Sequence, residues 1–155
     1  MALSTPKNAG GEIPGVPWLL WDILRAGRGR PEDTVSRQQV RLRRLIEYAR
    51  SRSPYYRERY AALPRGAQDL SALPPVTKSG LMANFNGWAT DPAVTREGAE
   101  AFIADPTRIG HLYLDRYLAF STSGTTGTPA VFLHDRGAIS VYQGLLLTRR
   151  LQTLI

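Results

Sequence analysis

The chain has 155 residues, of which 43% are hydrophobic and 21% charged, values typical of a folded globular protein and not of an intrinsically disordered one. It contains no cysteine, which excludes a disulfide framework and a thiolate metal site. No apolar run approaches the roughly 20 residues of a membrane-spanning helix, and no signal-peptide pattern leads the chain, so we expect a cytoplasmic protein without a membrane partner.

The charge balance is basic, with 20 Lys and Arg against 13 Asp and Glu, a net charge of +7. Only Lys7 and Lys78 are lysines, so arginine supplies nearly all of this charge. A GC-rich coding sequence would enrich arginine without any nucleic acid being bound. Because no recognised reader motif accompanies the charge, we do not expect a nucleic-acid partner.

The first part of the chain is predicted to be a flexible arm over residues 1–33, since 1–17 are rich in Gly, Pro, Ser and Thr and 25–31 form a basic Gly-rich turn. Residues 34–155 are assigned to one domain. An amphipathic helix is expected to begin near Thr34. Its apolar side would carry Val40, Leu42, Leu45, Ile46 and Ala49.

Further helices follow, each with a recognisable start. Ser53-Pro54 resembles an N-cap with proline at the first helical position, and it precedes a short helix over residues 55–60. Thr77 is the predicted cap of a third helix, and a fourth covers residues 95–103 before Asp105-Pro106 ends it. We expect the tyrosines of 55–60 to pack inward, although an aromatic and basic nucleic-acid surface is the alternative.

The pattern changes after residue 112. Residues 113–120 and 130–133 are apolar runs rich in aromatic or branched side chains, and a Ser/Thr/Gly stretch separates them. This predicts a strand, a loop and a strand, followed by a last helix that Asp135 caps, with His134 at the end of the second strand. The fold class is therefore mixed α/β, with a helical first part followed by a hairpin and a helix.

The loop from Ser121 to Pro129 carries the chemistry that we expect. Its glycines, Gly124 and Gly127, allow positive φ and a close approach of backbone N–H groups to an anion. Its hydroxyl groups are small hydrogen-bond donors. The predicted phosphate-binding residues are Thr122, Ser123, Gly124, Thr125, Thr126, Gly127 and Thr128.

The loop also has other interpretations. It is not a Walker A loop, because its glycines are three residues apart and no lysine follows the second. A polar hairpin that simply faces water is the structural alternative for any Ser/Thr/Gly run. Neither a catalytic residue nor a metal ligand is predicted; His111 has no second ligand at metal-binding spacing.

The string from Thr122 to Gly127, followed by Pro129, resembles the phosphate-binding motif of adenylate-forming enzymes. Within that superfamily the chain looks most like the amino-terminal portion of the phenylacetate–CoA ligase group. The upstream segments that support this narrower resemblance are 45–49, 53–57 and 73–78, in that order before the loop.

The resemblance implies a function. In such enzymes the loop holds the β- and γ-phosphates of ATP while a carboxylate attacks the α-phosphorus, which gives an acyl-adenylate and pyrophosphate. A thiol such as coenzyme A then displaces AMP, and Mg²⁺ takes part. The implied ligands are thus ATP, a carboxylic acid substrate and a thiol acceptor. A related possibility is an enzyme that transfers the acyl group to a protein or another acceptor.

Two departures from the family pattern matter. Lysines that many members carry beside the motif's proline are replaced by Thr128 and Ala130, and Arg136 is a candidate substitute for that charge. The family's acid-binding, Mg²⁺-binding and carboxy-terminal catalytic segments do not fit after Gly127. We therefore expect the chain to be a fragment that is inactive alone. The alternative function is a non-catalytic basic module that binds nucleic acid or an acidic partner.

Overall fold

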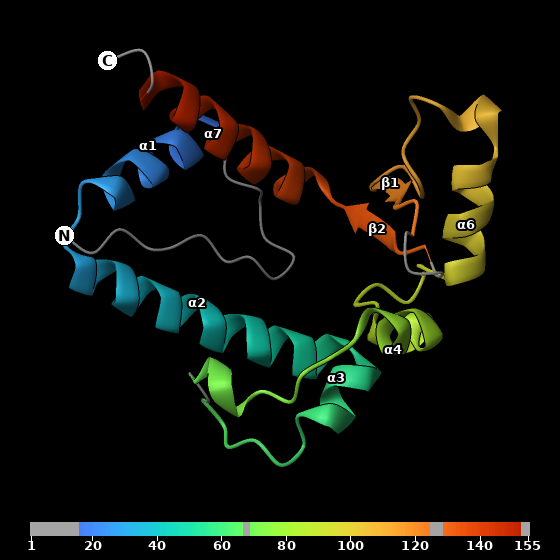
Figure 1. The fold of residues 1–155 in the computed structure, drawn as a ribbon, viewed down its shortest axis with the longest axis horizontal. Helices are drawn as coiled ribbons and strands as arrows, with labels where there is room; N and C mark the ends of the chain where they lie inside the picture. Colours follow the sequence, from blue (N-terminus) through green and yellow to red (C-terminus); the bar gives the residue numbers. More distant parts are fainter. Residues whose placement is uncertain (1–15, 67–68, 125–128, 153–155) are drawn as a thin grey trace.

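The computed structural model describes residues 16–66, 69–124 and 129–152 of the chain. The fold is mixed α/β, mostly helical, with one two-stranded antiparallel hairpin followed by a long helix. Figure 1 shows the hairpin next to α6, with α7 leading away from it to lie beside α1. The elements are α1 (Val16–Gly27), α2 (Pro31–Arg52), α3 (Pro54–Arg59), α4 (Lys78–Ala83), α5 (Phe85–Trp88), α6 (Arg96–Ala104), β1 (Leu118–Ser121), β2 (Val131–His134) and α7 (Arg136–Gln152), with 3₁₀ turns at Leu70–Ala72 and Pro106–Arg108.

The long helix α2 begins at Pro31, three residues before the predicted start at Thr34. Proline suits the first helical position because its missing N–H needs no partner there. The Asp33 carboxylate accepts a hydrogen bond from the backbone N–H of Arg30 at 3.3 Å and so satisfies one donor at the helix start. Acidic residues in the first turn and arginines in the last also complement the helix dipole.

Ser53 joins three helices. Its hydroxyl oxygen accepts a hydrogen bond from the Tyr56 N–H at 3.2 Å, which confirms the predicted N-cap of α3, and its hydroxyl donates to the carbonyl of Gly87 at 3.1 Å. The residue is completely buried. A buried hydroxyl with both of its roles used fixes the short helix α5 against the junction of α2 and α3.

The cap predicted at Thr77 is confirmed, and Thr95, predicted only as the first residue of a helix, is also a cap. Thr77 accepts a hydrogen bond from the Gly80 N–H and begins α4, and Thr95 accepts one from the Gly98 N–H and begins α6, each at 3.1 Å. Helix α6 ends at Ala104, before Asp105-Pro106, because proline cannot continue it. Both caps depend on bonds between residues three positions apart, a spacing that a short sequence motif can reveal.

The main core lies where α4, α5 and α6 meet the hairpin. Phe85 stacks edge-on against the Trp88 ring, and Phe102 lies 5.5 Å from Tyr113 between ring centres. Alternate side chains of a strand point to opposite faces, so only one face of the hairpin packs here. The buried members of this core are Met82, Phe85, Val94, Ala99, Tyr113, Ala130 and Val131.

The first strand is shorter than predicted. The sequence predicts an extended run over residues 113–120, but residues 113–117 form a tight turn and only Leu118–Ser121 is strand. Tyr113 and Tyr117 exchange backbone hydrogen bonds of 2.8 and 2.9 Å across this turn. The polar pair Asp115-Arg116 at its centre is compatible with a turn, so the apolar run is interrupted there.

Part of the predicted flexible arm is ordered helix. The described residues of that range, 16–33, form α1, a short turn and the first residues of α2; residues 1–15 lie outside the described part. Leu19 of α1 is buried against α7, and the Asp22 carboxylate pairs with Arg37 of α2 at 2.7 Å and with Arg41 at 3.1 Å. Helix α1 therefore connects α7 to α2. Within the described residues, no helix is both long and apolar enough to cross a membrane.

The close contact of α1 with α7 depends on Gly144. A Cβ atom placed on Gly144 would lie 3.2 Å from the Ile23 Cδ1 atom and 3.9 Å from the Leu19 Cβ atom, so alanine would be tight and a larger side chain would not fit. We predict that Gly144→Leu separates the two helices and lowers the free energy of unfolding by about 1–3 kcal/mol. Amide hydrogen exchange in α1 should rise in parallel.

The matched control for this prediction is Gly27→Leu at the end of α1, where an added Cβ would meet nothing within 4 Å. This variant should leave the exchange rates in α7 unchanged. Equal losses in the free energy of unfolding for the two substitutions would show that Gly144 has no special role in the packing of α1 against α7.

Candidate phosphate-binding site

The candidate loop projects from the end of the hairpin. Strands β1 and β2 are antiparallel, and their paired residues run from Leu118 with His134 to Ser121 with Val131. One step beyond, the Thr122 N–H donates to the Ala130 carbonyl at 3.0 Å, and the Ala130 N–H donates to the Thr122 Oγ1 at 3.2 Å. We call these two hydrogen bonds the neck of the loop.

The predicted site residues fall into two groups. Thr122 and Ser123 are exposed, and Gly124 is half-buried with φ of +59°. This conformation is the left-handed one that favours glycine, as expected at this position. Thr125, Thr126, Gly127 and Thr128 lie outside the described residues, so their predicted role stays a prediction.

The neck rests on the core. Ala130 and Val131 are 2% and 3% exposed, and they belong to the cluster formed with Ala99 of α6 and with Tyr113. A two-stranded hairpin is marginally stable by itself in water, so this packing is what holds the loop in place. The base of the loop is thus anchored in the hydrophobic core.

The other end of the hairpin is fixed by a side-chain cluster that the sequence did not predict. The Tyr117 hydroxyl donates to the Asp91 Oδ2 at 2.7 Å, and the Asp91 Oδ1 accepts a hydrogen bond from the Ala93 N–H at 3.0 Å. The Arg116 guanidinium lies 3.3 Å from the same carboxylate. Because Tyr117 and Asp91 are 26 residues apart, no local pattern signals their contact.

The turn before Tyr117 has an unusual backbone. Leu114 and Asp115 have φ of 51° and 56°, and the Arg116 N–H donates to the Tyr113 carbonyl at 3.1 Å. Leucine is rarely found in the left-handed region, where a residue other than glycine costs about 1–3 kcal/mol. The surrounding bonds from Tyr113 and Tyr117 hold this conformation, which directs the Tyr117 ring toward Asp91.

The electrostatics of the cluster agree with its geometry. Burial, then the hydrogen bond to Asp91 and its negative charge, raise the pKa of Tyr117 to about 12. The hydrogen bonds from Tyr117 and from the Ala93 N–H lower the pKa of Asp91. At neutral pH the pair is therefore a neutral phenol that donates to a carboxylate, which is a stronger bond than one between two neutral groups.

Residues that follow the second strand lie at the opposite end from the loop. Because His134 pairs with Leu118 at the base, Arg136 is separated from Val131 by the length of β2, about 10 Å at the usual rise of a strand. This position does not favour Arg136 as a substitute for the missing lysine. The Asp135 carboxylate accepts a hydrogen bond from the Ala138 N–H at 2.7 Å, which confirms its predicted capping role.

The outer face of the hairpin is aromatic and uncovered by the described residues. The Phe120 and Phe132 rings are stacked at 5.4 Å, and the His134 ring lies edge-on to Phe120 at 5.2 Å. Phe120 and Phe132 are about two-fifths exposed. The histidine lies at the strand end, as predicted, in a packed aromatic row, and no carboxylate of the described residues forms an ion pair with it.

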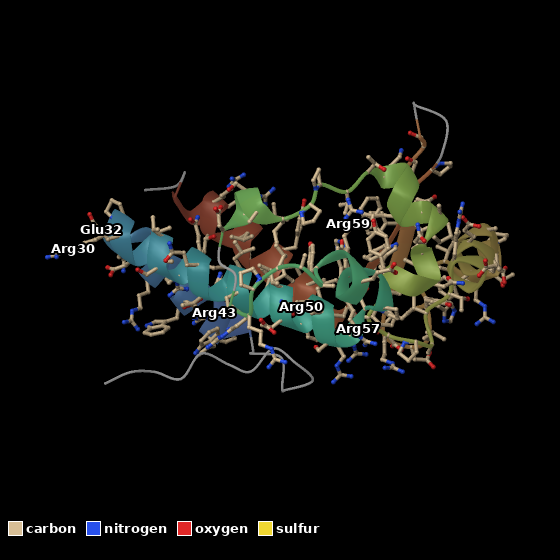
Figure 2. The ribbon with its side chains drawn as sticks, turned by 90° about the horizontal axis from the view of Figure 1, so that it is seen from below. Arg30, Glu32, Arg43, Arg50, Arg57 and Arg59 are labelled. Carbon is tan, nitrogen blue, oxygen red and sulfur yellow. The ribbon has the colours of Figure 1, made fainter. Side chains whose placement is uncertain are left out.

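The arginines of α2 and α3 serve partly as internal hydrogen-bond donors. Arg57 donates to the carbonyls of Arg50 and Ser51, which are orphan acceptors at the end of α2, and Arg50 donates to those of Leu63 and Pro64. Figure 2 shows Arg43 and Arg50 along α2 and Arg57 and Arg59 on the short helix that follows.

The tyrosines beside these arginines pack inward, as predicted. The Tyr56 and Tyr60 rings lie 5.2 Å apart, Tyr60 is 8% exposed, and burial raises the pKa of both.

Among the described residues, no group of three or more His, Asp or Glu side chains is placed to hold a metal ion. An open groove of about 260 Å³ lies between α5 and the start of α6. Its polar side chains are already paired, since Arg96 donates to Glu100 and to the Met82 carbonyl and Asn86 donates to Glu97.

No protein-family model, curated protein or solved structure matches this chain. A function is therefore inferred from the loop, the hairpin that carries it and the sequence motif itself.

The hydrogen bond between Tyr117 and Asp91 predicts a measurable stability effect. Tyr117→Phe removes the donor and should lower the free energy of unfolding by about 1–2 kcal/mol at neutral pH, measured by urea denaturation. Tyr113→Phe is a suitable control, because the Tyr113 hydroxyl has no such charged partner among the described side chains. A Tyr117→Phe variant as stable as the native chain would contradict the proposed role of this bond.

The pH dependence of this effect has a defined sign. The folded pKa of Tyr117 is raised to about 12, so the stabilisation is complete below about pH 10 and is lost as the pH rises through 12. The folded pKa of Asp91 is lowered, so its contribution is complete above about pH 4 and is lost at lower pH. The difference in the free energy of unfolding between the native chain and Tyr117→Phe should therefore be constant from about pH 5 to 9 and shrink above about pH 10. A difference that grows above pH 10 would contradict this assignment.

Proposed function

We propose that this chain supplies the ATP phosphate-binding hairpin of an AMP-forming ligase similar to phenylacetate–CoA ligases. The observation that carries the proposal is the Ser/Thr/Gly loop on a hairpin held at both ends, with Gly124 in the left-handed conformation at the entrance. A fixed neck with a hydroxyl-rich loop suits a ligand that is bound through backbone N–H and small hydroxyl donors.

In the proposed reaction the loop orients the β- and γ-phosphates so that pyrophosphate can leave when a carboxylate attacks the α-phosphorus. The work of the loop is positioning and charge stabilisation, for which preorganised donors are effective. Because Thr128 and Ala130 stand where many members of that group carry lysine, the sequence of the loop offers neutral donors only. Coenzyme A or another thiol would be the acyl acceptor, and Mg²⁺ would accompany ATP in the complete enzyme.

Exposed apolar surface supports the proposal that the chain works as part of a larger protein. Helix α7 is apolar on several sides, and α1 covers only the side with Gly144 and Thr148. A helix with apolar residues all round is usually buried, and large exposed apolar patches mark contact surfaces. The exposed large side chains of α7 are Val141, Tyr142, Leu145, Leu146 and Leu147.

A second candidate function follows from the uneven charge. Residues 25–65 contain 12 arginines and 4 acidic residues, a net charge of +8, while the rest of the chain has a net charge of −1. Arg43, Arg44 and Arg52 are exposed, and no described residue forms an ion pair with them. This segment could hold a polyanion, which would make the chain a non-catalytic binding module. Binding by this surface would weaken steeply with salt and would not respond to loop substitutions.

The leading proposal predicts the effect of removing the loop hydroxyls. Thr125→Val and Thr126→Val together should reduce carboxylate-dependent ATP–pyrophosphate exchange in the complete enzyme by about tenfold or more, because each lost hydrogen bond is worth about 1 kcal/mol. The matched control, Thr125→Ser with Thr126→Ser, keeps both hydroxyls and should retain most of the exchange. Unchanged exchange in the valine variant would overturn the proposal.

A further inference from the structure

We propose that Arg43, Arg50 and Arg57 bind the phosphate backbone of a nucleic-acid duplex without regard to its sequence. We call these three residues the arginine row. Figure 2 shows them one after another along α2 and the short helix α3. The inference rests on the second candidate function, to which it gives a site and a partner, and it is independent of the ATP-binding proposal.

The row lies in a strongly basic part of the chain. Residues 41–66 contain eight arginines and two glutamates. No carboxylate of the described residues forms an ion pair with a member of the row. Glu47, which lies between Arg43 and Arg50 in the sequence, accepts a hydrogen bond from the Gly66 N–H at 3.3 Å. The row therefore presents positive charge that no ion pair offsets.

Two of the guanidinium groups are held in place by backbone carbonyls. Arg57 donates from Nε to the Arg50 carbonyl at 3.3 Å and from Nη2 to the Ser51 carbonyl at 3.2 Å. Arg50 donates from Nη1 to the carbonyls of Leu63 and Pro64 at 3.2 and 3.4 Å. A carbonyl orients a guanidinium group without cancelling its charge. Less side-chain freedom is therefore lost when an anion binds.

Each member of the row keeps donors for a ligand. A guanidinium group has five N–H donors in a planar fork. Arg57 uses two of them and Arg50 uses only those of Nη1, while Arg43 is exposed and uses none toward the described residues. The remaining donors of each side chain are sufficient for a charge-assisted contact of two hydrogen bonds with a phosphate group.

The spacing of the row indicates an extended ligand. Arg43 and Arg50 are seven residues apart in α2, which is two turns of the helix. They lie on the same side of the helix and about 10 Å apart along its axis. A single phosphate group is too small to contact both. A polymer that repeats its phosphates along a backbone fits this spacing.

The surroundings of the row favour nucleic acid over a protein or a membrane. Within residues 41–66, all of which the structure describes, Leu45 is the only large hydrophobic side chain that is exposed. It follows Arg43 by two residues and so lies about 200° around the helix, away from the row. Protein interfaces have an apolar or aromatic centre, and interfacial membrane helices insert an apolar face. The row offers charge alone, through which proteins bind nucleic acid without sequence preference.

The tyrosines near the row favour a duplex over a single strand. The Tyr56 and Tyr60 rings lie 5.2 Å apart, and the Arg59 guanidinium lies over the Tyr55 ring at 5.8 Å. Proteins that bind single strands stack unpaired bases on open aromatic rings. These three rings are already in contact with other side chains and are not open platforms. A duplex keeps its bases stacked inside and directs its phosphates outward, toward a charged surface of this kind.

The experiment measures the binding of a fluorescent DNA duplex of about 20 base pairs to the full chain over a range of salt concentrations. Each phosphate contact adds about 0.9 to the slope of log K against log salt concentration. Arg43→Gln should therefore weaken binding at low salt and reduce the slope by about 0.9, and Arg43→Gln with Arg57→Gln should reduce it by about 1.8. The matched control is Arg44→Gln, which removes the same charge about 100° around α2 and should leave the slope unchanged.

The outcomes distinguish this inference from the second candidate function. Equal reductions of the slope by Arg43→Gln and Arg44→Gln would overturn the arginine row and leave a general polyanion-binding module. A native chain that binds no duplex at low salt would overturn both. Tighter binding of a single strand of the same length, or of polyglutamate, would overturn the assignment to a duplex. If the double variant does not fold, Arg43→Gln and Arg44→Gln still decide the matter, because neither side chain has an ion pair among the described residues.

Discussion

A two-stranded hairpin cannot hold its shape in water by backbone hydrogen bonds alone, and this constraint organises the described part of the chain. The hairpin of β1 and β2 gains its support from burial of Ala130 and Val131 against α6 and from the bond between Tyr117 and Asp91 at its base. Helix α6 provides the surface for the first contact, and Asp91 lies in the segment between α5 and α6. The loop can present polar groups to a ligand because its supports lie outside it.

The difference between local and long-range contacts explains what the sequence could predict. The caps Ser53, Thr77 and Asp135 act on residues three positions away, so a short motif is sufficient to identify them. The two strands of the hairpin and their order were also predictable, because apolar runs flank a Ser/Thr/Gly stretch. The coarse fold follows from such local signals.

Features that depend on distant contacts were missed or misplaced. The turn at Leu114 and Asp115 places two residues other than glycine in the left-handed region, and only the pairing of Tyr113 with Tyr117 and the contact with Asp91 explain it. The order in α1 likewise depends on packing with α7 and on the Asp22 ion pairs with α2. Composition predicts flexibility for this region because it contains no information about those partners.

The arginine surplus has a partly structural explanation. Arg50, Arg57 and Arg59 donate to backbone carbonyls, and Arg37 pairs with Asp22, so these side chains stabilise the junctions of α1, α2 and α3. Arginine suits this work because its planar group carries several donors in fixed directions. The remaining exposed arginines leave a basic surface on the same segment, which is the physical basis of the rival function.

The most direct test of the phosphate-binding assignment is photoaffinity labelling of the full chain with an ATP analogue that carries the reactive group on its γ-phosphate, followed by peptide mapping. Binding at the hairpin predicts that the label is attached within residues 119–134 and that ATP or pyrophosphate prevents labelling while adenosine does not. Label spread along α2 and α3, and removed by raised salt, would contradict the assignment and favour a polyanion-binding surface.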